Sequence, residues 1–218
     1  MSKKLTFLIL SGPTKEYIDP VRFISNNSSG KMGNALAEAA LIKGCNVIFI
    51  SGPANTFPSN VKLMEITTAL EMFKAVKLNF KKSDIIISAA AVSDYRPVKI
   101  YKHKIKKSSK KILIEFTQNP DIIKYCGKNK KNQIVTGFAL ETKNLINNAK
   151  MKLKNKNLDL ITANANESIG SDNTTAYIIN TDGSVIEIKN KDKKIVAEKI
   201  INETIRLFNN IKADKKVS

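Results

Sequence analysis

The sequence predicts an α/β fold, Rossmann-like and doubly wound, with a mostly parallel sheet that carries helices on both faces. Three observations support this prediction. Short apolar runs recur along the chain, helical patterns lie between several of them, and most runs are apolar throughout rather than alternating. Continuous apolar runs are typical of strands covered on both faces, and an alternation of strands and helices favours a parallel sheet.

The strands are predicted from the apolar runs themselves. They cover residues 5–10, 46–50, 61–66, 84–89, 133–137 and 158–162. Three helices are predicted between them, over residues 31–43, 68–80 and 143–154. Gly44 ends the first helix. Thr68 followed by Glu71 predicts a capping box at the start of the second.

Two regions interrupt this alternation. Residues 104–107 and 111–116, separated by Ser108 and Ser109, are predicted to form a two-stranded hairpin or lid. Residues 176–180 and 184–188 flank an Asp-Gly pair that suits a tight hairpin turn. An amphipathic helix over 195–208 is expected to close a single domain of residues 1–211, which leaves a polar, frayed C-terminal tail over 212–218.

Charge and composition limit the class of protein. The chain of 218 residues has 37 Lys plus Arg against 19 Asp plus Glu, a net charge of +18, which attracts anions. Only Arg22, Arg96 and Arg206 are arginines, whereas proteins that read base edges rely on the guanidinium group. A coding bias toward lysine explains the excess better than a nucleic-acid patch does. Cys45 and Cys126 lie far apart, so no disulfide or zinc site is predicted. No apolar window reaches ~18 residues, and a soluble, cytoplasmic protein with no membrane partner is expected.

The stretch FISNNSSGKMG, residues 23–33, has the features of a phosphate-binding loop. It follows the first strand region and opens the first predicted helix. In an open α/β sheet, ligands bind in the loops beyond the carboxyl ends of the strands; here those loops cover residues 11–30, 90–103, 138–142 and 163–174. Small side chains before a helix N-terminus let a phosphate approach unpaired backbone N–H groups.

Known phosphate-binding motifs do not match this stretch. Gly30-Lys31 is followed by Met32 and preceded five positions earlier by Ser25, so the P-loop pattern fails. The second strand ends in Ser-Gly-Pro without the acidic residue that holds a dinucleotide ribose. An NAD(P)-dependent Rossmann-type reductase is an alternative, supported by the Tyr95-x-x-x-Lys99 spacing, but Pro97 disfavours a shared helix face. A basic nucleic-acid-binding module is the other alternative, although most aromatic residues fall in apolar runs.

Six motifs taken in order resemble those of phosphopantothenoylcysteine synthetase, the CTP-dependent, amide-forming enzyme of bacterial coenzyme A biosynthesis. They are SGPTKEYIDPVRFISNNSSGKMG, ISAAAVSDYRP, HKIKK, QNPDI, GFALET and KNLDLITANANESIGSDN. The resemblance runs from residue 11 to about residue 180. It implies a ligase that joins phosphopantothenate and L-cysteine through an acyl-cytidylate, with CTP converted to CMP and pyrophosphate and Mg²⁺ expected beside the phosphates.

The resemblance also implies roles for particular residues. Asn26 matches the residue that binds the acyl intermediate, and Lys104 the lysine that acts in its formation. Arg22 suits a carboxylate or phosphate, unless it pairs with Asp19 or Glu16. Ala90 and Ala91 would let substrate lie against the main chain. The residues expected to bind CTP are Ser28, Ser29, Gly30, Lys31, Met32, Asp94, Lys104, Asn119, Pro120, Asp121, Ile122, Phe138, Lys152 and Lys156. Metal ligands are unknown.

Two further expectations concern assembly. Family members dimerise through a sheet extension, so residues 104–116 and 176–188 are candidates for crossing between the subunits of a homodimer. Many bacterial relatives also carry a flavin-dependent decarboxylase half. This chain begins at the first strand of the synthetase half, so it is either a free-standing synthetase or a piece of a longer protein.

Overall fold

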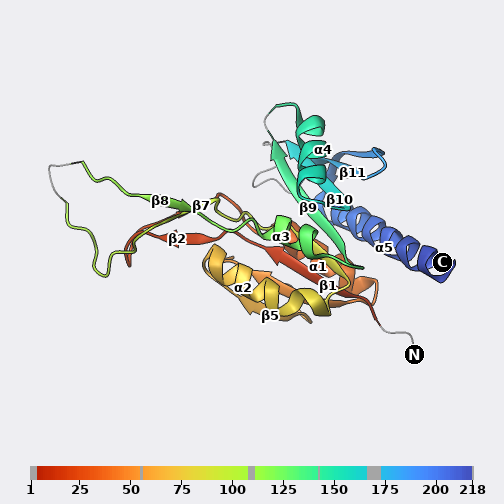
Figure 1. Ribbon diagram of the computed structural model, residues 1–218, viewed down its shortest axis with the longest axis horizontal. Coiled ribbons are helices and arrows are strands. Elements are labelled where there is room, and N and C mark those ends of the chain that lie inside the picture. Colours follow the sequence, from red (N-terminus) through yellow and green to blue (C-terminus); the bar gives the residue numbers. More distant parts are fainter. Residues whose placement is uncertain (1–3, 55, 108–110, 142, 166–172, 218) are drawn as a thin grey trace.

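The computed structural model describes residues 4–54, 56–107, 111–141, 143–165 and 173–217. Its centre is an eight-stranded sheet with the order β12-β11-β10-β9-β6-β1-β4-β5 (Figure 1). Six neighbouring strands are parallel: β1 (Thr6–Ser11), β4 (Asn46–Ser51), β5 (Lys62–Glu65), β6 (Ile85–Ser88), β9 (Ile134–Glu141) and β10 (Leu160–Ala165). The predicted α/β class and all six predicted strands are therefore confirmed.

Helices cover both faces of this sheet. The helices are α1 (Lys31–Ile42), α2 (Ala69–Asn79), the 3-10 turn η1 (Phe80–Lys82), α3 (Ile122–Asn129), α4 (Leu145–Asn155) and α5 (Lys193–Val217). Helices α1 and α5 pack on one face, and α2, α3 and α4 on the other. Strand β1 contributes side chains to the hydrophobic cores on both faces. Phe7 and Ile9 pack with α1 and α5, Leu8 and Leu10 lie on the face covered by α2, α3 and α4, and all four side chains are fully buried.

The predicted start signal of the second helix acts as expected. The Thr68 hydroxyl accepts a hydrogen bond from the backbone N–H of Glu71, whose carboxylate accepts from the backbone N–H of Thr68, so the capping box is present. Helix α3 was not predicted. Its start is marked by Asp121, whose carboxylate accepts from the backbone N–H of Lys124.

The C-terminal hairpin is confirmed, and the C-terminal helix is longer than predicted. Strands β11 (Asn173–Asn180) and β12 (Val185–Asp192) are antiparallel and extend the parallel sheet at one edge. Helix α5 continues through residues 212–217 instead of fraying, since that segment has neither glycine nor proline to end it.

The other predicted hairpin, over residues 104–107 and 111–116, is wrong among the described residues, and its turn at 108–110 lies outside them. Strand β8 (Phe116–Gln118) pairs instead with β7 (Tyr95–Pro97). We call residues 95–107 and 111–118 the arm, because they project from the body beside the hairpin of β2 (Lys15–Tyr17) and β3 (Phe23–Ser25) (Figure 1). The backbone of the 104–107 segment has other partners: Ile105 is bound by Asp19 and Arg22.

Candidate ligand-binding cleft

The order in which strands are added to the sheet reverses between β1 and β6, and the loops after these two strands meet at that point. The chain leaves β1 toward β4 and β5 and later returns to β6 on the other side of β1. Pro13 and Ala91 form an isolated parallel bridge, and the backbone N–H of Ala91 donates to the carbonyl of Gly12 at 2.9 Å. Such a switch point is where open α/β sheets bind ligands.

Asn26 ties these two loops together. Its side-chain Nδ2 donates to the backbone carbonyls of Ala91 at 3.3 Å and Val92 at 3.1 Å. The predicted substrate-binding residues Asn26, Ala90 and Ala91 therefore come from two distant segments and lie beside one another. In this arrangement the amide group of Asn26 positions the Ala91 loop.

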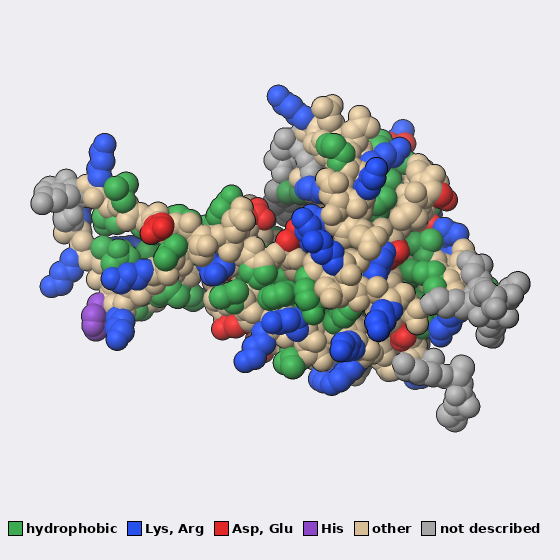
Figure 2. All heavy atoms as spheres, viewed as in Figure 1, with side chains coloured by type: hydrophobic (Ala, Val, Ile, Leu, Met, Phe, Trp, Pro, Cys, Tyr) green, Lys and Arg blue, Asp and Glu red, His purple; other side chains and the backbone are tan. Residues whose placement is uncertain are grey.

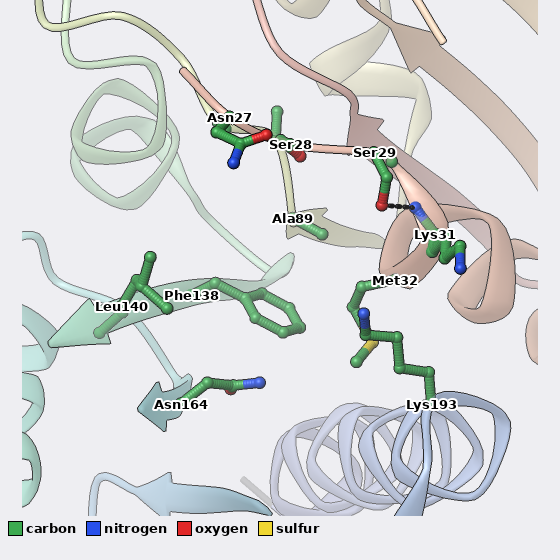
Figure 3. A pocket seen from close by; sticks show the side chains of 14 residues that line it. Asn27, Ser28, Ser29, Lys31, Met32, Ala89, Phe138, Leu140, Asn164 and Lys193 are labelled. Carbon is green, nitrogen blue, oxygen red and sulfur yellow. Dashed lines mark hydrogen bonds between the residues drawn. The ribbon is translucent and has the colours of Figure 1, made fainter. Parts of the chain in front are cut away.

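A first cavity of about 220 Å³ opens at this point (Figure 3). Its lining includes the five predicted cradle residues, the predicted alanines and Phe138. The complete lining is Asn27, Ser28, Ser29, Gly30, Lys31, Met32, Ala89, Ala90, Ala91, Phe138, Ala139, Leu140, Asn164 and Lys193. Residues 138–140 were expected in a loop but lie in strand β9, which continues to Glu141, and residues 163–165 likewise lie in strand β10. Residues 142 and 166–172 of the predicted loops lie outside the described residues.

The start of α1 suits close approach of an anion. Gly30 is the N-cap, with a φ of 74° that favours glycine, and no side chain caps the helix through a hydrogen bond. The backbone N–H of Lys31 makes a long contact, 3.5 Å, with the Ser29 hydroxyl (Figure 3). Gly33 packs directly on Ser11 of β1, where a Cβ would lie 2.1 Å from the hydroxyl oxygen. The helix end is thus held against the sheet with N–H groups at the cavity.

A second cavity of about 180 Å³ adjoins the first. Both cavities are lined by Ala90 and Phe138. The remaining lining of the second cavity is Ser88, Val92, Ser93, Asp94, Asn119, Pro120, Asp121, Ile122, Ile123 and Lys156. Of the residues expected to bind CTP, the second cavity is lined by Asp94, Asn119, Pro120, Asp121, Ile122, Phe138 and Lys156, but not by Lys152.

Hydrogen bonds hold the wall of the second cavity in place. The backbone N–H of Asn119 donates to the carbonyl of Asp94 at 2.8 Å, and its side-chain Nδ2 donates to the carbonyl of Ser93 at 2.9 Å. Lys156 Nζ lies 2.9 Å from Asp121 Oδ2, with both side chains partly exposed. Lys152 lies one helical turn earlier in α4 and does not line either cavity.

Arg22 and Lys104 lie outside both cavities. Arg22 Nη1 is 2.8 Å from Asp19 Oδ2, which is the ion pair considered as the alternative for this residue, and it also donates to the carbonyl of Ile105 at 3.2 Å. Lys104 is exposed on the arm. Burial raises the pKa of Asp19, but backbone N–H groups of Val21, Arg22 and Ile105 and the charge of Arg22 outweigh it and hold this pKa below its usual value.

Sequence reasoning named neither Asn164 nor Lys193 as a residue of the site, although both line the first cavity. Asn164 follows buried Ala163 near the end of β10. It falls within residues 163–174, which were expected to form a ligand-binding loop, but it was not named as a site residue. Lys193 begins α5, about 160 residues after the cradle, and was one lysine among many. No local sequence pattern connects Lys193 with the cradle, because packing of α5 beside α1 brings them together.

Other features bear on the alternatives. Tyr95 lies in strand β7 and Lys99 follows it, so the two do not share a helix face. Lysine and arginine side chains are scattered over the visible face and the arm without gathering in one patch (Figure 2). Within the described ranges, no group of three metal-ligating side chains is present. In the same part of the chain, no helix is long and apolar enough to cross a membrane.

The fold and the site define a Rossmann-like α/β protein with two adjoining cavities at the switch point of its sheet. The chain belongs to the family described as the DNA/pantothenate metabolism flavoprotein C-terminal domain, whose model matches residues 2–207. The predicted family relationship is thereby confirmed.

Curated relatives support the same assignment. The coenzyme A biosynthesis bifunctional protein CoaBC of Borreliella burgdorferi is 46% identical over 203 residues, which cover 91% of this chain and 52% of that protein. The protein of the same name from Haemophilus influenzae is 43% identical over 215 residues, 94% of this chain and 52% of that protein. The chain thus spans about half the length of the curated relatives it matches.

Solved structures share the fold. The crystal structure of the C-terminal domain of a coenzyme A biosynthesis bifunctional protein CoaBC is 38% identical, with a TM-score of 0.82 over 94% of this chain and 96% of that one. A Cab2 mutant in complex with phosphopantothenate-cysteine has a TM-score of 0.83 at 20% identity, covering 97% of this chain and 89% of that one, and is similar in fold.

Proposed function

We propose that this chain is a phosphopantothenate–cysteine ligase of coenzyme A biosynthesis that uses CTP. The observation that carries the proposal is that two adjoining cavities collect the residues expected at a phosphate cradle and at a nucleoside site. Matches to proteins of coenzyme A biosynthesis over most of the chain support it further.

The proposed reaction has two steps. A carboxylate oxygen of phosphopantothenate attacks the α-phosphorus of CTP, and the bond to the leaving pyrophosphate breaks. The amine nitrogen of L-cysteine then attacks the acyl carbon of the acyl-cytidylate, the bond to CMP breaks, and the amine proton is released. Positioning of the reactants and stabilisation of the phosphate charge are the tasks left to the protein.

The two cavities divide these tasks. The second cavity would hold the nucleoside, with Asp94 toward the ribose, residues 119–122 and Phe138 around the base, and Lys156 as a nearby cation. The first cavity would hold phosphate at Ser28–Met32. The α-phosphate and the acid would meet beside Ala90 and Phe138, which line both cavities. The small side chains of Ala90 and Ala91 leave space there for the reacting groups. Asn26 would hold this loop through Ala91 and Val92.

Lys104 would act from the arm. Because its backbone neighbour Ile105 is fixed by Asp19 and Arg22, Arg22 serves in this proposal to position the arm. Several apolar side chains of the arm are exposed: Val98, Ile100, Ile112 and Leu113, at 55%, 60%, 50% and 91%. We propose that they are covered in a cytoplasmic homodimer, with the β11–β12 hairpin as the other candidate contact. Sedimentation equilibrium tests this, and a monomer at micromolar concentration contradicts it.

Mg²⁺ is expected to accompany the triphosphate. Since the described residues hold no three-ligand cluster, phosphate oxygens and water would supply most of its ligands. Lys152, which does not line the cleft, has a weaker case for nucleotide contact than Lys156 has.

Pyrophosphate release by the purified, folded chain tests the function. Release is expected only with CTP, phosphopantothenate and Mg²⁺ together, and absence of release overturns the ligase proposal. Thermal shifts with CTP and ATP test the choice of base, because equal shifts remove the preference for cytosine. Lys104→Ala is expected to block formation of the acyl-cytidylate, and Lys102→Ala, a second exposed arm lysine, is the matched control.

A further inference from the structure

Thr14 is a fully buried residue that lines neither of the two cavities. It directly precedes β2, at the base of the hairpin that runs beside the arm (Figure 1). The backbone N–H of Lys15 donates to the carbonyl of Thr67 at 2.8 Å. The carboxylate of Glu16, which is also buried, accepts from the N–H of Ala69 at the start of α2, at 2.9 Å. The backbone beside Thr14 is therefore fixed to the segment that begins α2.

Hydrogen bonds join Thr14 to two distant segments of the site. Its hydroxyl oxygen accepts from the backbone N–H of Ser93 at 3.0 Å, a buried contact between residues 79 positions apart. Its carbonyl accepts from the Ser25 hydroxyl at 2.8 Å, and its backbone N–H donates to the carbonyl of Ala91 at 3.4 Å. Thr14 thus connects the end of β3 with the loop after β6.

Each of these segments carries a residue expected at a different ligand. The end of β3 leads into Asn26, which is expected to bind the acyl intermediate. Ser93 precedes Asp94, which is expected beside the ribose. The Ser93 carbonyl accepts from Asn119 Nδ2 at 2.9 Å, and the backbone N–H of Asn119 donates to the carbonyl of Asp94 at 2.8 Å. Because these last three residues line the second cavity, hydrogen bonds lead from the Asn26 segment through Thr14 to the wall of that cavity.

The loop after β6 is held at two adjacent places. Asn26 binds the carbonyls of Ala91 and Val92. Thr14 binds the N–H of Ser93, the next residue. Without the Thr14 hydroxyl, the N–H of Ser93 would lose this partner in a buried position, which is costly. The loop would then stay attached at Asn26 but shift at Ser93. A displacement of about 1 Å between bound reactants can slow a reaction roughly a hundredfold.

We propose that Thr14 is a positioning residue that holds the nucleotide loop, residues 93–94, at a fixed place relative to the Asn26 segment. The identity of the two ligands rests on the proposed function, in which this placement lets the attacking carboxylate meet the α-phosphate. Thr14 itself touches no ligand in this arrangement. Its loss should therefore lower kcat and leave the affinity for each substrate unchanged.

Hydrogen exchange of the free Thr14→Val protein tests the placement without any ligand. Valine has a similar shape but no hydroxyl. We expect about tenfold faster exchange, the equivalent of one lost hydrogen bond, at the amides of Ser93 and of Asn119, which is bound to the same loop. The Asn46 amide, which donates to the carbonyl of Leu5 at the opposite end of the sheet, is the internal control. Thr14→Ser keeps the hydroxyl and should exchange as the wild type does.

Turnover and binding test the consequence for the reaction. The kcat of Thr14→Val should fall at least about tenfold, whereas isothermal titration should give unchanged affinities for CTP and for phosphopantothenate. Thr14→Ser should restore kcat. Thr204→Val is the matched control, because Thr204 is also fully buried, donates its hydroxyl to the carbonyl of Ile201 within α5, and lines neither cavity. That variant should keep the wild-type kcat and the wild-type exchange at Ser93 and Asn119.

Unchanged exchange at Asn119, the same acceleration in Thr204→Val, or a failure of Thr14→Ser to restore the wild-type values overturns the proposal. So does an unchanged kcat, or a loss of affinity as large as the loss of kcat. If the wild type releases no pyrophosphate, the ligase is rejected and exchange at Asn119 alone decides the role of Thr14. Should Thr14→Val not fold, Ser25→Ala breaks the contact with the Thr14 carbonyl at a half-buried residue. It should lower kcat at unchanged affinities, and a wild-type kcat there contradicts the proposal.

Discussion

The backbone N–H of Ile105 donates a 3.2 Å hydrogen bond to the carboxylate of Asp19, which lies 86 residues earlier in the chain. The side chain of Asp19 is fully buried and also accepts from the backbone N–H groups of Val21 and Arg22, both at 2.8 Å. Arg22 completes the contact by donating to the carbonyl of Ile105. The backbone N–H and carbonyl groups of Ile105, the residue after Lys104, are therefore both held by the Asp19–Arg22 ion pair.

Asp19→Asn is expected to loosen the arm. The amide keeps one acceptor but turns an N–H₂ group toward the Ile105 N–H or Arg22, so at least one charge-assisted hydrogen bond is lost. Trypsin should cleave at the arm lysines several times faster, and kcat should fall more than the KM for CTP rises. The control is Asp84→Asn, whose carboxylate accepts from the Thr6 N–H at the other end of the sheet. Equal cleavage in both variants would contradict this assignment.

The same contact predicts a dependence on pH. The pKa of Asp19 lies below its ordinary value of 3.8 in the folded protein. A depressed carboxyl pKa stabilises the fold fully above the unfolded value, and this contribution disappears as the pH falls through the folded value. Hydrogen exchange at the Ile105 amide, corrected for its intrinsic rate, should be constant from pH 7 to about 5 and accelerate below the ordinary pKa. Asp19→Asn should lack that acceleration, and its presence there would assign the effect to other groups.

Asn26→Ala should uncouple the two loops of the cleft. It removes the two hydrogen bonds to the carbonyls of Ala91 and Val92, and each loss should lower the free energy of unfolding by about 1 kcal/mol. We expect a modest loss of stability but a much larger loss of turnover. Rapid-quench analysis should show the acyl-cytidylate accumulating. The Asn34→Ala variant is the control, because Asn34 also donates to backbone in a loop, at Thr56. Wild-type turnover in Asn26→Ala would remove this residue from the mechanism.

Gly33→Ala should destabilise the cradle end of α1. The new methyl would lie 2.1 Å from the Ser11 hydroxyl oxygen and 2.4 Å from the Ser11 Cβ, an overpacking that costs roughly 1–3 kcal/mol. Urea unfolding measures the change. A double variant with Ser11→Gly should be less destabilised than the sum of the single variants, because the Ser11 Cα is 3.3 Å away. Strict additivity would show that the crowding arises elsewhere.

Lys156→Met should weaken nucleotide binding by about tenfold, the equivalent of one charge-assisted contact. Lys156 lines the second cavity, where it pairs with Asp121, so the loss should be equal for CTP and CMP. Lys154→Met, an exposed lysine of the same helix, is the control in the titration. A loss confined to CTP would move Lys156 to the triphosphate end.

Local signals in the sequence were sufficient for the main elements. Continuous apolar runs gave the six parallel strands, Thr68 and Glu71 gave a helix start, and the Asp-Gly pair gave the β11–β12 turn. These features depend on residues close together in the chain, whose backbone preferences and hydrophobic periodicity are readable there. The motif order also assigned Asp94, residues 119–122 and Lys156 to one nucleotide site, and the structure brings them to one cavity.

The tertiary structure decided which residues from distant segments of the chain contact one another. The pairing of β8 with β7, the clamp on Ile105 and the approach of Lys193 to the cradle join residues separated by about 20 to 160 positions. The sequence alone left open whether Arg22 binds a ligand or pairs with Asp19. It also could not distinguish Lys193 from the other lysines. Charge and residue type do not report position, because the packing of helices on a sheet, and not spacing along the chain, brings such groups together.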